Sequence, residues 1–408
     1  MKILHTSDWH IGHKLHHQDR TEEHLYFFQW LIETINKEKI DTLLVSGDIF
    51  DIGYPSNAML HTYFNFLLEL KDSHCSHIII TGGNHDHTST LDAPRELLKA
   101  MNIDIIGGMP EQLDQEVIYL EDSKNEQTIA IIATPFLRDR DIRKSVPGES
   151  FDDKMKAVQQ GVSNHYRQAV DHILEENDSK PILIAMGHLL ITGASASDSE
   201  REIHIGSLNG ISIDLFPEEI DYFALGHIHR PQKIKQKENI RYSGSPIPLS
   251  FSEHKDIKKV ILIETHENNE LTISELETPK LRNWGRVKGT LEEVKTKMSE
   301  CHSSKEYKDW YEIQIIETQY HPDIIREYEE WIEANRENDH YKIIKESLRF
   351  EHNENLQQKR DQYTKDLNEM SVQDVFTSLL EDKNISDKDE LVQSLNELIQ
   401  NNQSLLDL

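Results

Sequence analysis

The feature that most limits the possible folds is a regular alternation of short apolar runs with longer amphipathic stretches. The apolar runs have the length and composition of buried β-strands and occupy residues 3–6, 42–46, 77–81, 128–133, 181–186 and 222–225. The stretches between them have helical spacing at residues 22–37, 57–70, 94–101 and 153–176. Strands that alternate with helices predict an α/β fold, here a β-sandwich flanked by helices.

The rest of the chain is less regular. Residues 240–243, 258–265 and 271–277 predict antiparallel strands that close the edge of the sheet. After Pro279, residues 286–289, 291–298, 311–317 and 323–334 suggest a small β-α-β-α unit. We therefore expect three parts, with a core domain at 1–278, a small α+β capping domain at 279–340 and a helical tail at 341–408.

The tail is rich in Gln, Asn, Lys and Glu and ends in two short amphipathic patterns. The first pattern runs from Val372 to Leu380 and the second from Leu391 to Ile399, each with apolar residues three and four apart. Two interpretations stay open: a pair of helices that pack on this chain's own core, or a hairpin that docks on a partner.

Polar motifs with adjacent glycines follow five of the predicted strands. Seven of their side chains offer metal-binding atoms: the carboxylates of Asp8 and Asp48, the amide oxygen of Asn84, and the imidazoles of His10, His188, His227 and His229. Loops at the carboxyl ends of strands in α/β sheets share one ligand crevice, so we expect these groups to converge. The glycines before Asp48, Asn84, His188 and His227 permit sharp turns and close backbone approach.

Seven ligands are too many for a single four-coordinate zinc ion. Shared between two ions about 3.5–4 Å apart, with one bridging carboxylate, they form a hydrolytic two-metal centre. Oxygen and nitrogen ligands without thiolate favour manganese, iron or zinc, and histidine disfavours magnesium and calcium. The chemistry that such a pair serves is phosphoester hydrolysis.

Composition excludes several other classes of protein. The 408 residues include 44 Lys plus Arg and 73 Asp plus Glu, for a formal charge of −29. Residues 280–408 hold 18 basic and 28 acidic residues, so neither part of the chain is basic and an autonomous nucleic-acid-binding module is disfavoured. The two cysteines, Cys75 and Cys301, form no CxxC pair, which excludes a disulfide scaffold and a zinc finger. No apolar run has the length of a signal peptide or membrane span, so we expect a cytoplasmic protein without membrane contact.

The five motifs together resemble the calcineurin-like metallophosphoesterase superfamily, whose pattern D-x-H, G-D, G-N-H-D/E, G-H and G-H-x-H is matched without a gap. Three segments, LHTSDWHIG at 4–12, PFLR at 135–138 and SGSPIPLSFSE at 243–253, are similar to the SbcD family, the nuclease subunits of bacterial SbcC–SbcD complexes. The resemblance covers residues 1 to about 265 by motif and the remainder only by general layout.

This resemblance implies roles for individual residues. It gives Asp8, His10, Asp48 and His229 to one metal ion, and Asp48, Asn84, His188 and His227 to the other, with Asp48 bridging and manganese as the usual ion. It makes His85 the catalytic residue that touches the scissile phosphate without binding metal. Asp86 either orients His85 or is a structural carboxylate, and Asp51 is expected to cap the following turn. His16, His17 and Cys75 are expected to be ordinary surface or core residues.

The resemblance also implies the substrate and the partners. Relatives of this kind cut DNA duplex ends exonucleolytically (3′–5′) and nick single strands and hairpins, in DNA repair, recombination and replication. The chain has no GxxxxGK[ST] loop, so any ATP dependence must come from an SbcC-type coiled-coil ATPase. A homodimer of this chain within a heterotetramer or larger assembly is expected.

Two alternatives use the same metals or none. One is a phosphodiesterase or phosphatase that acts on a small molecule or phosphoprotein, and the other is an inactive scaffold that recruits a partner.

A local basic cluster is a candidate DNA contact and consists of Arg138, Arg140, Arg143 and Lys144. The acidic residues Asp139 and Asp141 alternate with these side chains and weaken the positive charge of the cluster.

Overall fold

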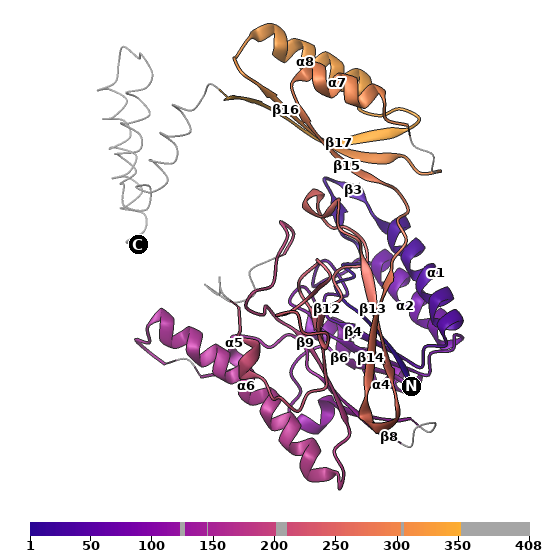
Figure 1. Ribbon diagram of the computed structural model, residues 1–408, viewed down its shortest axis with the longest axis vertical. Coiled ribbons are helices and arrows are strands. Elements are labelled where there is room, and N and C mark those ends of the chain that lie inside the picture. The colour runs from indigo at the N-terminus through magenta and orange to yellow at the C-terminus, as the bar shows by residue number, and fades with distance from the viewer. Residues whose placement is uncertain (123–126, 145, 201–209, 303–305, 352–408) are drawn as a thin grey trace, which may run out of the picture. The chain divides into compact units, whose positions relative to one another are not determined.

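The computed structural model describes residues 1–122, 127–144, 146–200, 210–302 and 306–351 (Figure 1). The chain divides into two compact units. The first comprises Met1–Arg286, Cys301–Glu312 and Arg336–Lys345, and the second comprises Val287–Glu300, Ile313–Asn335 and the described residues from Glu346 onward. The predicted phosphoesterase motifs all lie in the first unit.

Six strands form the first sheet, in the order β14-β13-β1-β4-β5-β6. Their bounds are Lys2–Thr6 (β1), Thr42–Ser46 (β4), His77–Thr81 (β5), Ile103–Ile106 (β6), Lys259–Thr265 (β13) and Leu271–Glu277 (β14). Strands β1, β4, β5 and β6 run parallel, while β13 and β14 add an antiparallel edge. The predicted strands at 258–265 and 271–277 do close a sheet edge in this way.

The second sheet also has six strands, in the order β11-β12-β10-β9-β8-β7. Their bounds are Val117–Asp122 (β7), Gln127–Ala133 (β8), Ile182–His188 (β9), Tyr222–Gly226 (β10), Gln232–Lys233 (β11) and Ile240–Tyr242 (β12). The expectation that β12 belongs to the antiparallel edge with β13 was wrong, because β12 pairs in parallel with β10. A two-stranded hairpin, β2 (Lys14–Leu15) with β3 (Gln18–Asp19), stands apart from both sheets.

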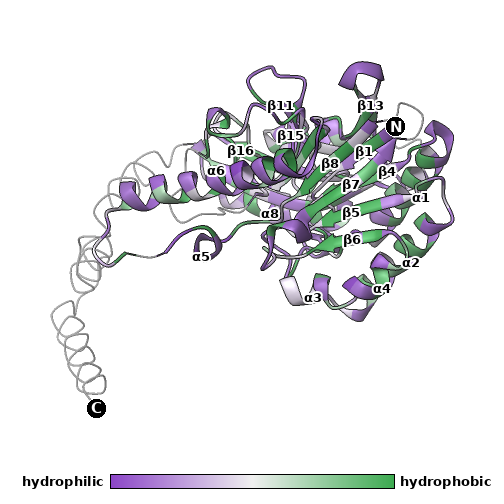
Figure 2. Ribbon diagram, turned by 90° about the horizontal axis from the view of Figure 1, so that it is seen from below, coloured by the Kyte–Doolittle hydropathy of each residue, from purple (hydrophilic) through white to green (hydrophobic). Residues whose placement is uncertain are grey.

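Helices cover the outer faces of the two sheets. The helices of the first unit are α1 (Thr21–Glu38), α2 (Asn57–Lys71), α3 (Thr88–Asp92), α4 (Arg95–Lys99), α5 (Asp139–Ile142) and α6 (Phe151–Glu176), with 3₁₀ turns at Leu113–Glu116, Ile213–Leu215, Phe251–Glu253 and Glu267–Asn269. Phe27 and Leu31 of α1 pack with Phe66 of α2 against the first sheet, and Tyr166 and Ile173 of α6 pack against the second. Figure 2 shows the strands as the hydrophobic part and the helices as largely hydrophilic on their outer sides.

The two sheets face each other across a third apolar core. Its buried residues come from both sheets: Ile3, Leu44, Ile79, Ile106 and Ile263 from the first, and Ile129, Ile131, Ile184, Met186 and Ala224 from the second. Each large aliphatic side chain buried there contributes about 1.5–3 kcal/mol of transfer free energy. The predicted β-sandwich flanked by helices is therefore confirmed.

A three-stranded sheet in the order β15-β16-β17 contains Trp284–Gly289, Asp309–Glu317 and Tyr341–Phe350. Each of these strands begins in the first unit and ends in the second. The second unit also contains α7 (Leu291–Ser299), which begins with a capping box between Thr290 and Glu293, and α8 (Pro322–Asn335).

Strand β17 corrects one expected boundary. The sequence pattern places residues 341–350 in a helical tail, but they form a strand, because Tyr341, Ile343 and Ile344 supply buried apolar positions at its start. The two amphipathic patterns after Ser371 lie outside the described residues. Within the described ranges, no helix is long and apolar enough to cross a membrane.

Candidate metal centre

The predicted side chains lie at the carboxyl ends of five strands. Asp8 and His10 follow β1, Asp48 follows β4, Asn84 and His85 follow β5, His188 is the last residue of β9, and His227 and His229 follow β10. Strands β1, β4 and β5 are neighbours in the first sheet, and β9 and β10 are neighbours in the second. The two sheets therefore bring the five loops to one crevice, as expected for this class of fold.

Three groups of described side chains are close enough to hold a cation, and two of these groups contain Asp8. The ligand atoms of Asp8, His10 and His229 lie within 4.8 Å of one another, and so do those of Asp8, Asp48 and His188. All five residues are buried. The Nε2 atoms of His10 and His229 face each other at 3.2 Å.

Asp48 contacts both groups. Its Oδ2 atom lies 3.4 Å from His10 Nε2 and 3.3 Å from His188 Nε2. Its Oδ1 atom accepts the backbone N–H of His85 at 2.9 Å, which fixes the carboxylate between the groups. Asn84 Oδ1 lies 3.0 Å from the same His188 Nε2 atom.

His227 has a different relation to these groups. Its ring lies 5.4 Å from the ring of His188, and its backbone N–H donates to Asp8 Oδ1 at 2.8 Å. His227 is buried beside the cluster, but it is outside both groups of ligand atoms within 4.8 Å.

The backbone is strained where four of these residues stand. Asp8, His10, Asp48 and His227 all have positive φ, at 54°, 47°, 52° and 98°. Residues other than glycine adopt this region rarely, and such strain persists where the surrounding structure holds a functional geometry. Two of the neighbouring glycines are required by space: a Cβ at Gly83 would stand 2.1 Å from Asp48 Oδ1, and a Cβ at Gly226 would stand 1.8 Å from the carbonyl oxygen of Ser46.

Acceptor oxygens near Nδ1 leave the Nε2 atoms of two histidines facing the cluster. His188 Nδ1 donates to the carbonyl oxygen of Ser46 at 3.0 Å, which leaves the lone pair on Nε2. His10 Nδ1 lies 3.3 Å from Asp51 Oδ1. Metal-binding histidines commonly have an acceptor at the second nitrogen, because it fixes the tautomer and raises ligand basicity.

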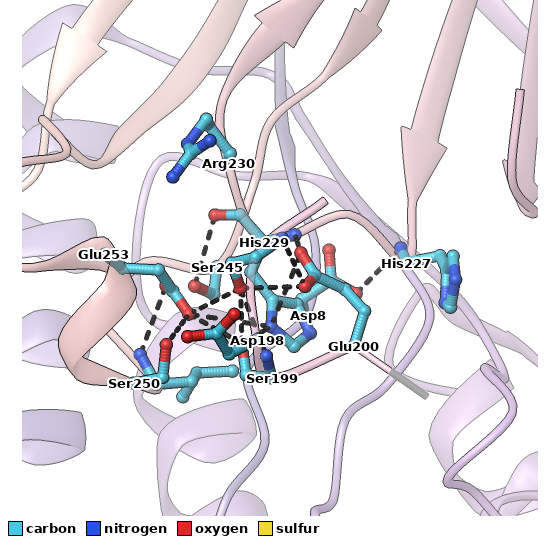
Figure 3. Close-up of polar contacts among 12 residues, drawn as sticks. Asp8, Asp198, Ser199, Glu200, His227, His229, Arg230, Ser245, Ser250 and Glu253 are labelled. Atoms are coloured by element: carbon cyan, nitrogen blue, oxygen red, sulfur yellow. Dashed lines mark hydrogen bonds and ion pairs between the residues drawn. The ribbon is translucent and has the colours of Figure 1, made fainter. Parts of the chain in front are cut away.

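His229 is held by a longer chain of contacts (Figure 3). Its Nδ1 lies 2.7 Å from Ser199 Oγ, and that hydroxyl donates to Glu253 Oε1 at 2.6 Å. Since the serine proton points to the carboxylate, the serine oxygen accepts the Nδ1 proton of His229, and Nε2 again faces the cluster. Buried Lys258 pairs with Glu253 and also donates to the carbonyl oxygen of His229 at 2.7 Å.

Electrostatics favour a cation here. Burial raises the pKa of Asp8 to about 6, against the opposing effect of His188. Burial acts to lower the pKa of His188, but the nearby Asp48 carboxylate raises it to about 9. Two fully buried carboxylates and converging imidazoles form a donor set that suits a divalent transition metal.

His85 lies next to the cluster on the same loop as Asn84. Its ring is 4.7 Å from the ring of His10, and its Nδ1 lies 2.8 Å from the carbonyl oxygen of Asp51. A third group of ligand atoms within 4.8 Å consists of His10, Asp51 and His85. The geometry therefore offers one alternative cation position that includes His85.

The carboxylate of Asp86 serves the backbone. It accepts the N–H groups of Ile49, Phe50 and Gly83 at 3.0, 3.0 and 2.9 Å. Of the two interpretations of Asp86, the structural one is confirmed.

Three residues around the cluster were missed by sequence reasoning or given another role. Asp51 was expected to cap a turn, but its carboxylate contacts His10. Burial acts to raise the pKa of Asp51, but the hydrogen bond to His10 and the charges of the neighbouring histidines together lower it. Ser199 carries no recognisable sequence signal. Glu253 does, since it ends the segment SGSPIPLSFSE, but no pattern connects that segment to His229 before the chain is folded.

Comparison with known proteins agrees with this geometry. Residues 1–231 match the family model for calcineurin-like phosphoesterase, and residues 281–384 match that for the type 5 capsule protein repressor C-terminal domain. Residues 1–231 thus belong to the calcineurin-like phosphoesterases, a class of hydrolases that act on phosphoester bonds.

Curated relatives specify the family. The chain is 33% identical over 386 residues to SbcD, the D component of nuclease SbcCD, of Escherichia coli strain K12, covering 93% of this chain and 92% of that protein. It is 30% identical over 323 residues to the protein of the same name from Bacillus subtilis strain 168, covering 77% and 79%. The chain belongs to the SbcD family of nuclease subunits.

Proposed function

We propose that this protein is the metal-dependent nuclease subunit of an SbcCD-type complex. The single observation that carries the proposal is the position of Asp48, whose carboxylate lies within 3.4 Å of imidazole nitrogens from both sheets. In a chain of this family, that position is suited to a carboxylate shared by two metal ions.

The ligand assignment divides into two sets that share Asp48. The first set is Asp8, His10, Asp48 and His229, and the second is Asp48, Asn84, His188 and His227. These sets are supported by the contacts of Asp48 and Asn84 and by the three histidines whose Nε2 atoms face the cluster, His10, His188 and His229. The donor types suit Mn²⁺. When bound, the two ions would stabilise negative charge on the phosphoryl oxygens.

His85 is proposed as the acid that protonates the leaving oxygen. Its Nδ1 donates to the Asp51 carbonyl oxygen, so in the imidazolium form Nε2 is the nitrogen that carries the transferable proton. Because the Asp51 side chain contacts His10 while its carbonyl contacts His85, one residue sets the positions of a ligand and of the acid.

A three-substrate assay tests the substrate class. With Mn²⁺, we expect the protein to cleave a DNA hairpin faster than a cyclic dinucleotide and to leave a phosphopeptide intact. Preference for the dinucleotide or the phosphopeptide would favour the small-molecule phosphodiesterase or phosphatase alternative. Absence of any cleavage, with metal bound, would favour an inactive scaffold.

The contacts behind His229 lead to a prediction about metal affinity. Ser199→Ala removes the acceptor of the Nδ1 proton, and Glu253→Gln weakens the group that orients Ser199. Loss of such a partner typically lowers metal affinity about 10–100-fold, and we expect that range for Mn²⁺ binding measured by titration calorimetry. Ser199→Thr keeps the hydroxyl and is the matched control, for which we expect near-normal affinity. If Ser199→Ala and Glu253→Gln bind Mn²⁺ as tightly as the unmodified protein does, these contacts do not support the site.

The partner is proposed from the names of the relatives and from the tail. We propose that two copies of this chain join an SbcC-type ATPase, and that the amphipathic patterns after Ser371 bind its coiled coil. Deletion of residues 371–408 is then expected to abolish the complex in co-purification and the ATP-dependent cutting of duplex ends. Nicking of single-stranded DNA with Mn²⁺ should persist, because the metal centre lies wholly within residues 8–229. A truncated protein that still binds SbcC, or that fails to fold, would assign these residues to the chain's own core.

A further inference from the structure

A cavity of about 500 Å³ adjoins the metal-binding cluster. His10, His85 and His229 line it together with Asp51, so it gives access to the proposed reaction site. A volume of this order is typical of small-ligand pockets and matches a short length of a single strand.

Three cationic side chains line the same cavity. Lys14 comes from β2, Arg286 from β15 and Lys345 from β17, all within the first unit. The carboxylates among the lining residues are Asp51 and Asp198. In a chain of net charge −29, this places positive charge beside the proposed reaction site, where a phosphate must approach.

A buried carboxylate holds two of these cations in place. Glu312 is 1% exposed and accepts Arg286 Nε and, at 2.7 Å, Lys345 Nζ, whose side chains are 31% and 44% exposed. A guanidinium has five N–H donors and an ammonium has three, so sharing one carboxylate leaves both cations able to bind phosphate. The pair and Glu312 together carry a net charge of +1.

The basic segment at 138–144 is arranged differently. Arg143 donates to both carboxylate oxygens of Glu149, at 2.7 and 3.0 Å, and Arg140 lies 3.6 Å from Asp141. No described residue of this segment lines the cavity. The segment therefore has less support as a DNA contact than the cavity cations have.

We propose that Lys14, Arg286 and Lys345 bind the phosphate backbone of a single nucleic-acid strand whose scissile phosphate lies at the metal cluster. This inference rests on the proposed nuclease function and adds to it the residues that hold the strand. It also explains how a chain of net charge −29 holds a polyanionic substrate near its proposed metal ions.

Salt dependence of binding tests the inference. Binding of a fluorescent single-stranded oligonucleotide is followed by anisotropy, in EDTA to prevent cleavage, over about 50–300 mM salt. Each phosphate contact contributes about −0.7 to the slope of log affinity against log salt for single strands. We expect Lys14→Gln, Arg286→Gln and Lys345→Gln each to reduce the slope by about that amount and to weaken binding at every salt concentration.

Matched controls make the result specific. Lys37→Gln changes an exposed lysine of α1, 82% exposed, and should keep the original slope. Arg140→Gln tests the basic segment at 138–144. If this variant reduces the slope and the three cavity variants leave the slope unchanged, the inference is overturned. Arg286 and Lys345 both pair with buried Glu312, so their substitution can also destabilise the fold. Lys14 is exposed, so a reduced slope for Lys14→Gln reports on binding and not on folding. Equal weakening of phosphopeptide binding by the cavity variants would show a general phosphate site and would also overturn it.

The proposed function is tested separately. Hydrolysis of bis(p-nitrophenyl) phosphate by the unmodified protein with Mn²⁺ depends on the metals and not on a bound strand. If that activity is present and the slopes are unchanged, the inference about the strand fails alone. If no phosphodiester is hydrolysed, the proposed function itself fails.

Discussion

Asp48→Asn is expected to abolish DNA cleavage and to release both metal ions. The Asp48 carboxylate lies 3.4 Å from His10 Nε2 and 3.3 Å from His188 Nε2, so its charge supports both proposed sites. Asparagine keeps the shape but loses the negative charge that two cations share. Loss of several kcal/mol of transition-state stabilisation corresponds to a fall of about 10³-fold or more in rate.

Elemental analysis of the purified variant gives the metal content, and hairpin cleavage gives the rate. Asn84→Ala is the comparison variant, because Asn84 contacts only the His188 side of the cluster through its Oδ1 atom. We expect that variant to keep one tightly bound ion and some activity. An Asp48→Asn protein with two ions and a normal rate would show that Asp48 is not shared.

His85→Ala is expected to lower the rate by about 10²–10⁴-fold while the metal content stays near that of the unmodified protein. A hydrogen bond from Nδ1 to the Asp51 carbonyl oxygen holds His85 in place. His85 belongs to neither of the two groups of ligand atoms that contain Asp8. Removal of a proton donor slows the chemical step without removing a ligand.

Substrates with different leaving groups distinguish an acid role of His85 from a structural role. With a p-nitrophenyl leaving group, which departs without protonation, His85→Ala should lose much less activity than with DNA. An equal loss on both substrates would argue against an acid role. Loss of a metal ion in this variant would instead place the cation in the third group, with His10, Asp51 and His85 as its ligands.

Several strands and helices of the first unit follow closely from the sequence because their signals are local, whereas β6 and β7 were not predicted. Strands β4, β5 and β14 have the predicted bounds, and α2 differs from prediction by one residue at its end. Pairing between strands depends on contacts distant in sequence, which is why β12 was placed in the wrong sheet. In β17 the buried apolar residues, Tyr341, Ile343 and Ile344, all lie near its start, so the more polar remainder resembled the tail that follows.

The positions of the motif-bearing residues at the ends of strands were also predictable, because each stands near a glycine or a second polar motif residue just after an apolar run. What surrounds them was not. Ser199 reaches His229 from a loop 30 positions away, and Glu253 reaches Ser199 across 54 positions, so only the folded chain brings these groups together. The positive φ of Asp8 and Asp48 likewise has no sequence signal, since most aspartates in proteins have negative φ.

The most direct measurement is anomalous X-ray diffraction from crystals of the protein grown with Mn²⁺. We expect two anomalous peaks about 3.5–4 Å apart, with the Asp48 carboxylate in contact with both. One peak should contact Asp8, His10 and His229, and the other should contact Asn84, His188 and His227. A single peak, or a peak held by His10, Asp51 and His85 with Asp48 outside its coordination, would contradict the two-metal centre.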